Sequence, residues 1–149
     1  MNIAIVGATG NVGRKLLEVL EKKNFPIDEL FLIASSKSVG KKINFKGKEY
    51  SIHDLESFDF SSVKIAFFAA GSVIADKWAP IVSQKAIVID NSKFFRMDSD
   101  VPLIVPEVNS KDLKDYKKKN IISNANCSVI PLVVVLKPLH DLYNIKRIV

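Results

Sequence analysis

The chain has 149 residues, of which 48% are hydrophobic and 26% are charged. This length and apolar content suit one domain with a hydrophobic core, and they exclude a disordered segment or a small disulfide-stapled module. The net charge is +6, but the basic residues are not interleaved with aromatic side chains that stack on bases. We therefore expect no nucleic acid among the partners.

The sequence also limits where the protein works. Its first residues run directly into a predicted strand without the features of a signal peptide, and no apolar run is long enough to cross a bilayer. The single cysteine, Cys127, excludes an intramolecular disulfide and a cysteine-built metal cluster. We expect a cytoplasmic protein with no membrane partner and no metal.

The first 34 residues predict a strand–helix–strand unit. Residues 2–6 form a short apolar run, and residues 11–23 place apolar side chains on one helical face with charged side chains opposite. Pro26 ends this helix, so the apolar residues 30–34 predict the next strand. The opening is therefore interpreted as a βαβ unit.

The same alternation continues along the chain. A hairpin is predicted around residues 46–48, and residues 63–70 are apolar on both faces, as in a central parallel strand. The other predicted elements are a helix at 73–84, a strand at 86–89, a short helix at 112–118, a strand at 121–122 and a helix at 130–143. This order predicts an α/β fold with a doubly wound, Rossmann-like parallel sheet.

The last residues have a different character. Residues 145–149 resemble the start of an apolar strand, and a domain seldom finishes on an unpaired strand, so we expect further chain beyond Val149. We divide the sequence into a nucleotide-binding domain at 1–130, which carries the cysteine, and a segment at 131–149. That segment is interpreted as a linking helix and the first strand of a second domain, the rest of which this chain lacks.

A glycine-rich segment, GATGNVG at 7–13, lies between the first predicted strand and helix. Glycines permit a tight turn there and let the backbone approach a pyrophosphate at the positive end of the helix. A purely structural turn is the alternative interpretation. The cofactor contacts that we predict in this segment are Gly7, Thr9, Gly10, Asn11, Val12 and Gly13.

The type of cofactor is predicted from the end of the second strand. An NAD site usually carries an acidic residue there, about 20 residues after the glycines. This chain instead offers Ser35, Lys37 and Ser38, whose hydroxyls and cation suit the 2′-phosphate of NADP. An ordinary polar loop is the alternative, because lysine holds a phosphate less exactingly than arginine. We also assign Gly71 and Ser72 to the cofactor site.

Cys127 lies between a predicted strand and a predicted helix, where backbone N–H groups and the helix dipole favour a thiolate. Beside a dinucleotide site this position indicates a nucleophile, whereas a cysteine taken alone is more often a small core residue. His53 and His140 are the candidates for an imidazole base, and neither is well placed. We therefore expect the general base to be missing from these residues.

Four segments resemble the aspartate-semialdehyde dehydrogenase family. They are GATGNVG at 7–13, SSKSVGKK at 35–42, DNSKFFRMDSDVPLIVPEVN at 90–109 and SNANCSVIPLVVVLKPLHD at 123–141. The resemblance covers essentially the whole chain. It implies reduction of the acyl phosphate aspartyl-β-phosphate to aspartate semialdehyde with NADPH, a step toward lysine, methionine and threonine.

The resemblance also implies roles for particular residues. Cys127 becomes the nucleophile that forms the acyl thioester, with Asn126 beside it, and Arg96 holds the substrate phosphate. Lys37 stands where the family usually has arginine, and Ala125 where proline is common. The family's catalytic histidine, its substrate-orienting glutamine, its carboxylate-binding arginine and its homodimer contacts belong to a second domain.

Two other functions stay open at this point. N-acetyl-glutamyl-phosphate reductases also place a cysteine after a dinucleotide fold, although the DNSKFFRMD and PEVN segments argue against that family. A non-catalytic nucleotide-binding or oligomerising module is the other alternative, in which Cys127 is structural.

Overall fold

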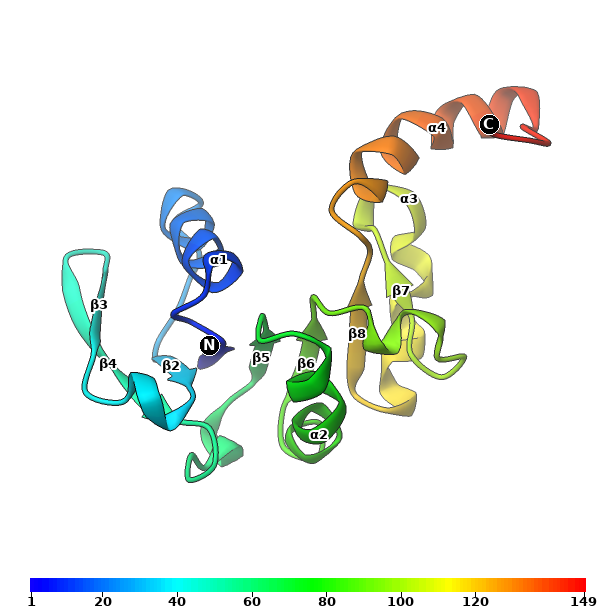
Figure 1. The fold of residues 1–149 in the computed structure, drawn as a ribbon. Helices are drawn as coiled ribbons and strands as arrows, with labels where there is room; N and C mark the ends of the chain where they lie inside the picture. The colour runs from blue at the N-terminus through cyan, green and yellow to red at the C-terminus, as the bar shows by residue number, and fades with distance from the viewer.

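The structure, a computed structural model, describes residues 1–149 as one eight-stranded sheet with helices on both faces (Figure 1). The strand order is β3-β4-β2-β1-β5-β6-β8-β7. The strands are β1 (Ile3–Val6), β2 (Leu30–Ala34), β3 (Lys42–Phe45), β4 (Lys48–Asp54), β5 (Ile65–Phe68), β6 (Ile87–Asp90), β7 (Leu103–Ile104) and β8 (Ile121–Asn124). The predicted α/β, doubly wound fold is confirmed.

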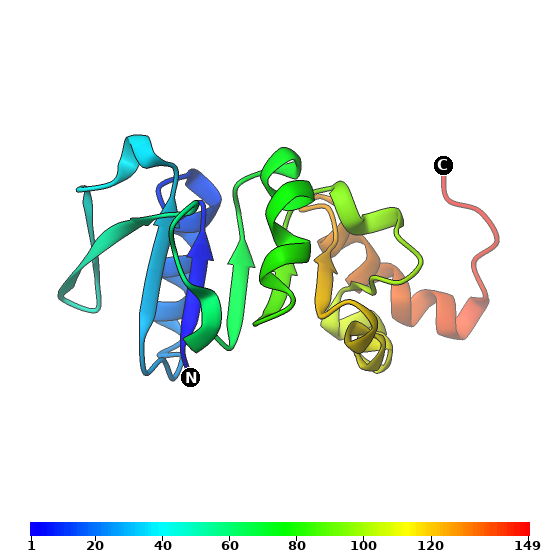
Figure 2. The same ribbon diagram turned by 90° about the horizontal axis from the view of Figure 1, so that it is seen from below.

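Helices connect the strands and cover the sheet. The α-helices are α1 (Asn11–Lys22), α2 (Ser72–Val82), α3 (Pro106–Asn109) and α4 (Val129–Tyr143). The 3-10 helices are η1 (Ser36–Ser38), η2 (Phe60–Ser62), η3 (Phe94–Met97) and η4 (Ser110–Lys118). Figures 1 and 2 show α1 on one face of the sheet and α2 on the other.

The central strand β1 explains why the sheet lies between two layers. All four of its residues are fully buried, as a strand covered on both faces requires. Ile3 and Ile5 belong to the apolar cluster formed with α1, whereas Ala4 and Val6 belong to the cluster formed with α2. The strand period of two therefore divides one apolar run between two cores.

The predicted hairpin is confirmed and adds an antiparallel edge to the sheet. β3 and β4 pair antiparallel around Lys46 and Gly47, whose φ angles are 50° and 75°. Two consecutive positive φ angles are typical of the tight turn that matches strand twist. β4 then pairs in parallel with β2, so the sheet is mixed where we predicted a parallel one.

Two further predictions need correction. The helix predicted at 112–118 is a 3-10 helix that already begins at Ser110. Residues 145–149, predicted to begin a strand, form none, because a strand exists only beside a hydrogen-bonded neighbour and no strand lies next to them. The two-residue strand β7 was missed, since it is too short to show a period.

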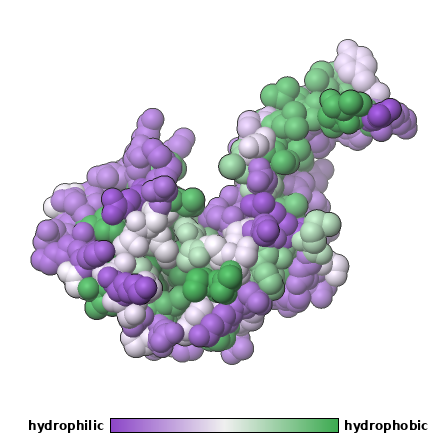
Figure 3. All heavy atoms as spheres, in the orientation of Figure 1, coloured by the Kyte–Doolittle hydropathy of each residue, from purple (hydrophilic) through white to green (hydrophobic).

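Helix α4 differs from the others because it leaves the body of the protein. It packs on α3, and none of its residues is buried. Figure 3 shows its apolar side chains gathered on the surface, and Val135 is 63% exposed. None of the helices combines the length and the apolar character that a membrane crossing requires.

Candidate functional site

The predicted site residues meet at one edge of the sheet. β1, β2, β5, β6 and β8 run parallel to one another, so their carboxyl ends lie at the same edge. The segments that follow these strands carry nearly every predicted site residue: 7–13, 35–38, 71–72, 91–96 and 125–127. We call this edge the carboxyl edge.

A cavity of about 340 Å³ opens at the carboxyl end of β1, where the order of the strands changes from one side of β1 to the other. β2 pairs with β1 on one side, and β5 pairs with β1 on the other side. Open α/β sheets bind ligands in the crevice at such a point. The cavity is lined by Val6, Gly7, Thr9, Gly10, Ala34, Ser35, Leu55, Ala69, Ala70 and Ile74. Only four of these were predicted, because the apolar lining residues read as ordinary core residues in the sequence.

The glycine-rich turn leaves backbone donors free at this cavity. The Gly10 N–H donates to the Gly7 carbonyl at 3.0 Å, and the Arg14 N–H donates to the Gly10 carbonyl at 3.0 Å. The other N–H groups of the turn after Ala8 have no partner in the protein: those of Thr9, Asn11, Val12 and Gly13. Unpaired N–H groups at the start of a twelve-residue helix form an anion site that fits a pyrophosphate.

The three glycines of the turn have different roles. A Cβ on Gly13 would lie 2.4 Å from the Gly7 carbonyl oxygen, and a Cβ on Gly7, whose φ is +88°, would lie 2.8 Å from Ala69. These two glycines therefore allow the turn to pack against β5 and α1. A Cβ on Gly10 would lie 3.4 Å from the Gly7 carbonyl oxygen, an ordinary contact, so packing does not require a glycine there.

The loop after β2 places its polar side chains around the same opening. Ser35 lines the cavity, whereas Lys37 and Ser38 lie just outside it on η1. The Ser38 N–H donates to the Ser35 carbonyl at 2.8 Å, which holds the turn, and the Lys37 ammonium has no protein partner. The loop thus carries an unpaired cation two residues after Ser35, which lines the cavity.

The two predicted cofactor residues at the start of α2 do not line the cavity. Gly71 caps α2 with φ +84°, and its carbonyl accepts the Ala75 N–H at 3.0 Å. Ser72 is the first residue of α2. Neither lines the cavity, whereas Ile74, one turn later, does.

A second hollow extends from α1 toward the other half of the edge. It has a volume of about 380 Å³ and is lined by Asn11, Val12, Lys15, Leu16, Val19 and Asn91. Two predicted cofactor residues, Asn11 and Val12, therefore face this hollow and not the first cavity. Because Asn91 follows β6, the hollow connects the glycine-rich turn with the Arg96 segment.

Arg96, on η3, is held by the ends of two strands. Its Nε donates to the Asn124 carbonyl at 3.0 Å, and its Nη2 donates to the Asn91 carbonyl at 3.3 Å. The two asparagines are joined in turn, because Asn124 Nδ2 donates to Asn91 Oδ1 at 2.8 Å. We call these three residues the Arg96 cluster; sequence reasoning found the arginine and missed the two asparagines.

An ion pair fixes the segment after Arg96. Lys119 Nζ donates to Asp98 Oδ2 at 2.8 Å, which joins the end of η3 to the end of η4. The hydrogen bond from Lys119 and a backbone hydrogen bond from Asp100 lower the pKa of Asp98, and the same bond to Asp98 raises the pKa of Lys119. The charges therefore persist at neutral pH and keep the η3 segment beside β8.

Cys127 is exposed, three residues after the end of β8, in the turn that starts α4. Asn126 organises this turn: its Oδ1 accepts the Ser128 N–H at 2.9 Å, and its carbonyl accepts the Val129 and Ile130 N–H groups. The Cys127 N–H has no protein partner. The thiol thus stands beside its own free backbone donor at a helix start.

Both histidines lie away from this arrangement. His53 is an exposed residue of β4 whose ring packs 5.2 Å from that of Phe58 and 6.2 Å from that of Phe31. His140 lies near the end of α4. The carboxyl edge therefore contains an exposed thiol and a guanidinium held by two carbonyls, but no imidazole.

Comparisons with known proteins agree with this geometry. Residues 2–116 match the family described as semialdehyde dehydrogenase, NAD binding domain. The aspartate-semialdehyde dehydrogenase of Aquifex aeolicus is 55% identical over 149 residues, which are 99% of this chain and 44% of that protein. The chain thus spans less than half the length of such relatives.

Solved structures give the same result. Aspartate semialdehyde dehydrogenase II of Vibrio cholerae, complexed with ASA, superposes with a TM-score of 0.92 at 50% identity, over 94% of this chain and 46% of that one. The Candida albicans aspartate semialdehyde dehydrogenase, solved with NADP, has a TM-score of 0.75 at 26% identity, over 97% of this chain and 48% of that one.

Proposed function

The chain belongs to the semialdehyde dehydrogenase family through its NAD-binding domain, and from this premise we propose that it is the nucleotide-binding, nucleophile-bearing part of an aspartate-semialdehyde dehydrogenase. The proposed reaction is the NADPH-dependent conversion of aspartyl-β-phosphate to aspartate semialdehyde through a thioester on Cys127. The observation that carries the proposal is the placement of the glycine-rich turn, Arg96 and Cys127 at one edge of one sheet. Cytoplasmic location and a homodimer of the full-length protein stay predictions.

The free N–H groups of the glycine-rich turn support a dinucleotide cofactor. They offer several donors to a pyrophosphate at the start of α1. The absence of an acid after β2 and the unpaired cation of Lys37 favour NADP over NAD. When bound, NADPH supplies the hydride that reduces the acyl group.

The nucleophile end supports acyl transfer from a phosphate. The Cys127 thiolate attacks the acyl carbon, the bond from that carbon to the phosphate oxygen breaks, and inorganic phosphate leaves. The Arg96 guanidinium, held at Nε and Nη2 by two carbonyls, balances the charge of the phosphate. The free Cys127 N–H can donate to the oxyanion that forms during the attack.

Acyl transfer to Cys127 tests this proposal without needing turnover. The chain is mixed with acetyl phosphate, and mass spectrometry locates the acetyl group while released phosphate is measured. We expect acetylation at Cys127 that saturates with acetyl phosphate and is lost in Cys127→Ala. Arg96→Ala should raise the half-saturating concentration, whereas its reaction with iodoacetamide, which carries no phosphate, should stay normal. Acetylation no faster than that of a free thiol would contradict the proposal.

The same experiment separates the runner-up functions. A non-catalytic module with a structural cysteine should show neither saturation nor dependence on Arg96. An N-acetyl-glutamyl-phosphate reductase would show both, but the similar proteins above are aspartate-semialdehyde dehydrogenases. Aspartate semialdehyde should therefore protect Cys127 from iodoacetamide better than N-acetylglutamate semialdehyde does.

A further inference from the structure

Arg14 is a cation at the carboxyl edge that the site described so far does not use. It is an exposed residue in the second turn of α1, and its Nε donates to the Thr9 carbonyl at 3.1 Å. That is the only hydrogen bond of its side chain, and no carboxylate lies within ion-pair distance. The two terminal nitrogens of the guanidinium are therefore fixed in place by Nε but have no protein partner.

The side of α1 on which Arg14 lies follows from helix geometry. Arg14 and Glu21 are seven residues apart, which is close to two helical turns, so they share one side of the helix. Glu21 Oε1 accepts the Lys46 N–H in the β3–β4 hairpin at 3.0 Å. This side of α1 therefore faces β3 and β4, and η1 packs on β4.

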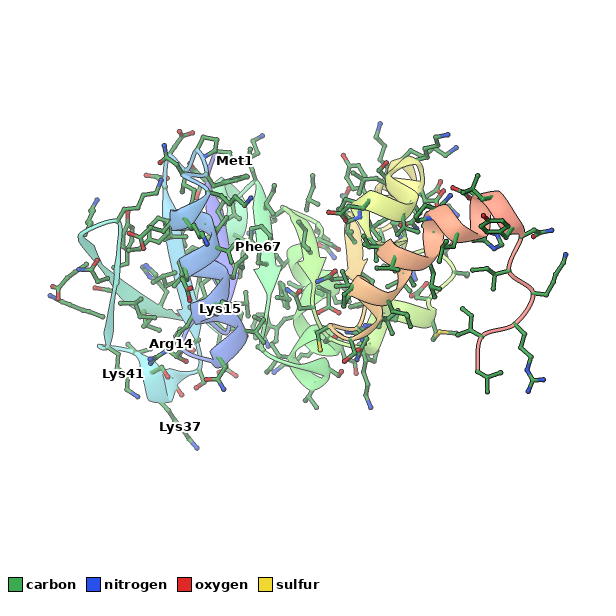
Figure 4. All side chains as sticks on the ribbon, turned by 90° about the horizontal axis from the view of Figure 1, so that it is seen from above. Met1, Arg14, Lys15, Lys37, Lys41 and Phe67 are labelled. Atoms are coloured by element: carbon green, nitrogen blue, oxygen red, sulfur yellow. The ribbon has the colours of Figure 1, made fainter.

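Arg14 accordingly lies on the flank of α1 that the loop after β2 occupies. Figure 4 shows Arg14, Lys37 and Lys41 in the same half of the molecule as Met1 but on its opposite side, with Lys37 directed outward. Thr9, whose carbonyl anchors Arg14, lines the cavity together with Ser35. Arg14 is thus anchored on one lining residue of the cavity, and η1 begins directly after another.

The chemistry of the loop leaves a role for this guanidinium. A phosphate at the ribose 2′ position lies beside the residue that follows β2. Lys37 offers only a flexible point charge there, whereas a guanidinium can donate two parallel hydrogen bonds to a phosphate. The two terminal nitrogens of Arg14, on the neighbouring helix, could donate these two hydrogen bonds.

We propose that Arg14 is a specificity-determining residue that binds the 2′-phosphate of NADP together with Lys37 and Ser38. This inference rests on the proposed NADP preference and deepens it. The ligand that Arg14 recognises is a phosphate monoester on the ribose of an adenine nucleotide, and the pyrophosphate is left to the free N–H groups of the turn.

Binding measurements on paired variants test the inference. Lys15 is the matched control, because it is the next cation along α1 but forms an ion pair with Glu18 and lines the other hollow. Calorimetry would compare NADP with NAD for the unaltered chain, Arg14→Ala, Arg14→Lys and Lys15→Ala, after thermal unfolding has shown that each variant folds.

We expect Arg14→Ala to weaken NADP binding by about tenfold, the scale of one charge-assisted contact, and to leave NAD binding unchanged. Arg14→Lys should recover part of the loss, and Lys15→Ala should leave the ratio of the two affinities unchanged. Competition by 2′-AMP, but not by 5′-AMP, should weaken in parallel.

The possible failures are distinguishable. If the unaltered chain binds NAD as tightly as NADP, the proposed cofactor preference is wrong, and the role of Arg14 with it. If the chain prefers NADP and Arg14→Ala keeps that preference, only the Arg14 inference is wrong. Equal losses for NADP and NAD would place Arg14 at the pyrophosphate, which also overturns the inference.

Discussion

The two ends of the carboxyl edge are built differently. At the nucleotide end, residues 1–38, α1 buries Gly13, Leu17 and Leu20 against β1 and β2, and the glycine-rich turn packs on β5. At the nucleophile end, residues 90–143, Cys127 precedes α4, a fifteen-residue helix with no buried residue. Figure 1 shows α1 lying on the sheet and α4 pointing away from it.

This contrast separates binding from catalysis. The free N–H groups of the nucleotide end are positioned by glycine packing and by a helix with its own core, so we expect residues 1–149 to bind the proposed cofactor by themselves. The nucleophile end holds Arg96 through three hydrogen-bonded residues, but α4 is apolar on nearly all sides, and such a helix is normally covered. We therefore expect the two ends to behave differently in experiments.

The largest expected difference is between binding and turnover. Residues 1–149 should bind NADP but show no measurable reduction of NADP with aspartate semialdehyde and phosphate. No imidazole lies at the carboxyl edge, and acid–base catalysis typically contributes ~10²–10⁴-fold. A chain extended to the length of the relatives should be active and lose activity in Cys127→Ala. Robust turnover by residues 1–149 would contradict the contrast, and His140 would be the first residue to substitute.

Amide hydrogen exchange should report the contrast directly. Amides of α1 should be protected to the level of global unfolding, whereas amides of α4 should exchange through local opening, because few apolar contacts hold that helix. Mass spectrometry of peptic fragments would measure both helices in one sample. Equal protection of the two helices would show that α4 is held more firmly than its exposure indicates.

Two glycine substitutions should separate packing from binding at the nucleotide end. Gly13→Ala places a Cβ 2.4 Å from the Gly7 oxygen and should lower the free energy of unfolding by about 1–3 kcal/mol, the usual cost of overpacking. Gly10→Ala, with φ −78° and a Cβ that would make an ordinary 3.4 Å contact, should fold normally and bind NADP more weakly. Urea unfolding and calorimetry would measure the two effects, and similar unfolding curves for both variants would refute the assignment.

The asparagines of the Arg96 cluster should have a smaller effect. Asn91→Ala leaves the half-buried Asn124 amide without its acceptor, which should cost about 1 kcal/mol of stability. The lost side-chain bond also joins the two residues whose main-chain carbonyls hold Arg96. The concentration of acetyl phosphate that half-saturates acetylation of Cys127 should therefore rise. Asn91→Asp keeps an acceptor for Asn124 but cannot replace the bond that Asn91 Nδ2 donates to the Phe68 carbonyl at 3.3 Å, so it should recover only part of the lost stability. Asn2→Ala, at the opposite edge of the sheet, serves as the control.

The smallest expected effect is on acid stability. Hydrogen bonds from Lys85 and Ser61 lower the pKa of Asp59 from 3.8 to about 2. A carboxyl whose pKa is lowered by folding stabilises the protein above its unfolded pKa, and this contribution is lost as the pH falls toward 2. In Asp59→Asn, the unfolding temperature should therefore fall less steeply between pH 4 and pH 2 than in the unaltered protein. The change should be small, since both partners are exposed.

Local sequence patterns predicted most of the strands and helices. The apolar runs at residues 3–6, 30–34 and 65–68 predicted buried strands, and the amphipathic period of residues 11–22 predicted α1, because these signals lie within a few consecutive residues. The glycines and the position of Cys127 between a strand and a helix were equally local. The sequence alone therefore determined which segments belong to the carboxyl edge.

Tertiary structure decided what those residues contact. The packing of Gly7 on Ala69, the lining of the cavity by Leu55 and Ile74, and the bond from Asn124 to Asn91 depend on residues far apart in the chain. Such pairs leave no periodic signal, because each partner resembles an ordinary core or loop residue by itself. The sequence determined the elements and their order, whereas the side chains that meet at the edge were set by strand register and by the crossing from β2 to β5 on opposite sides of β1.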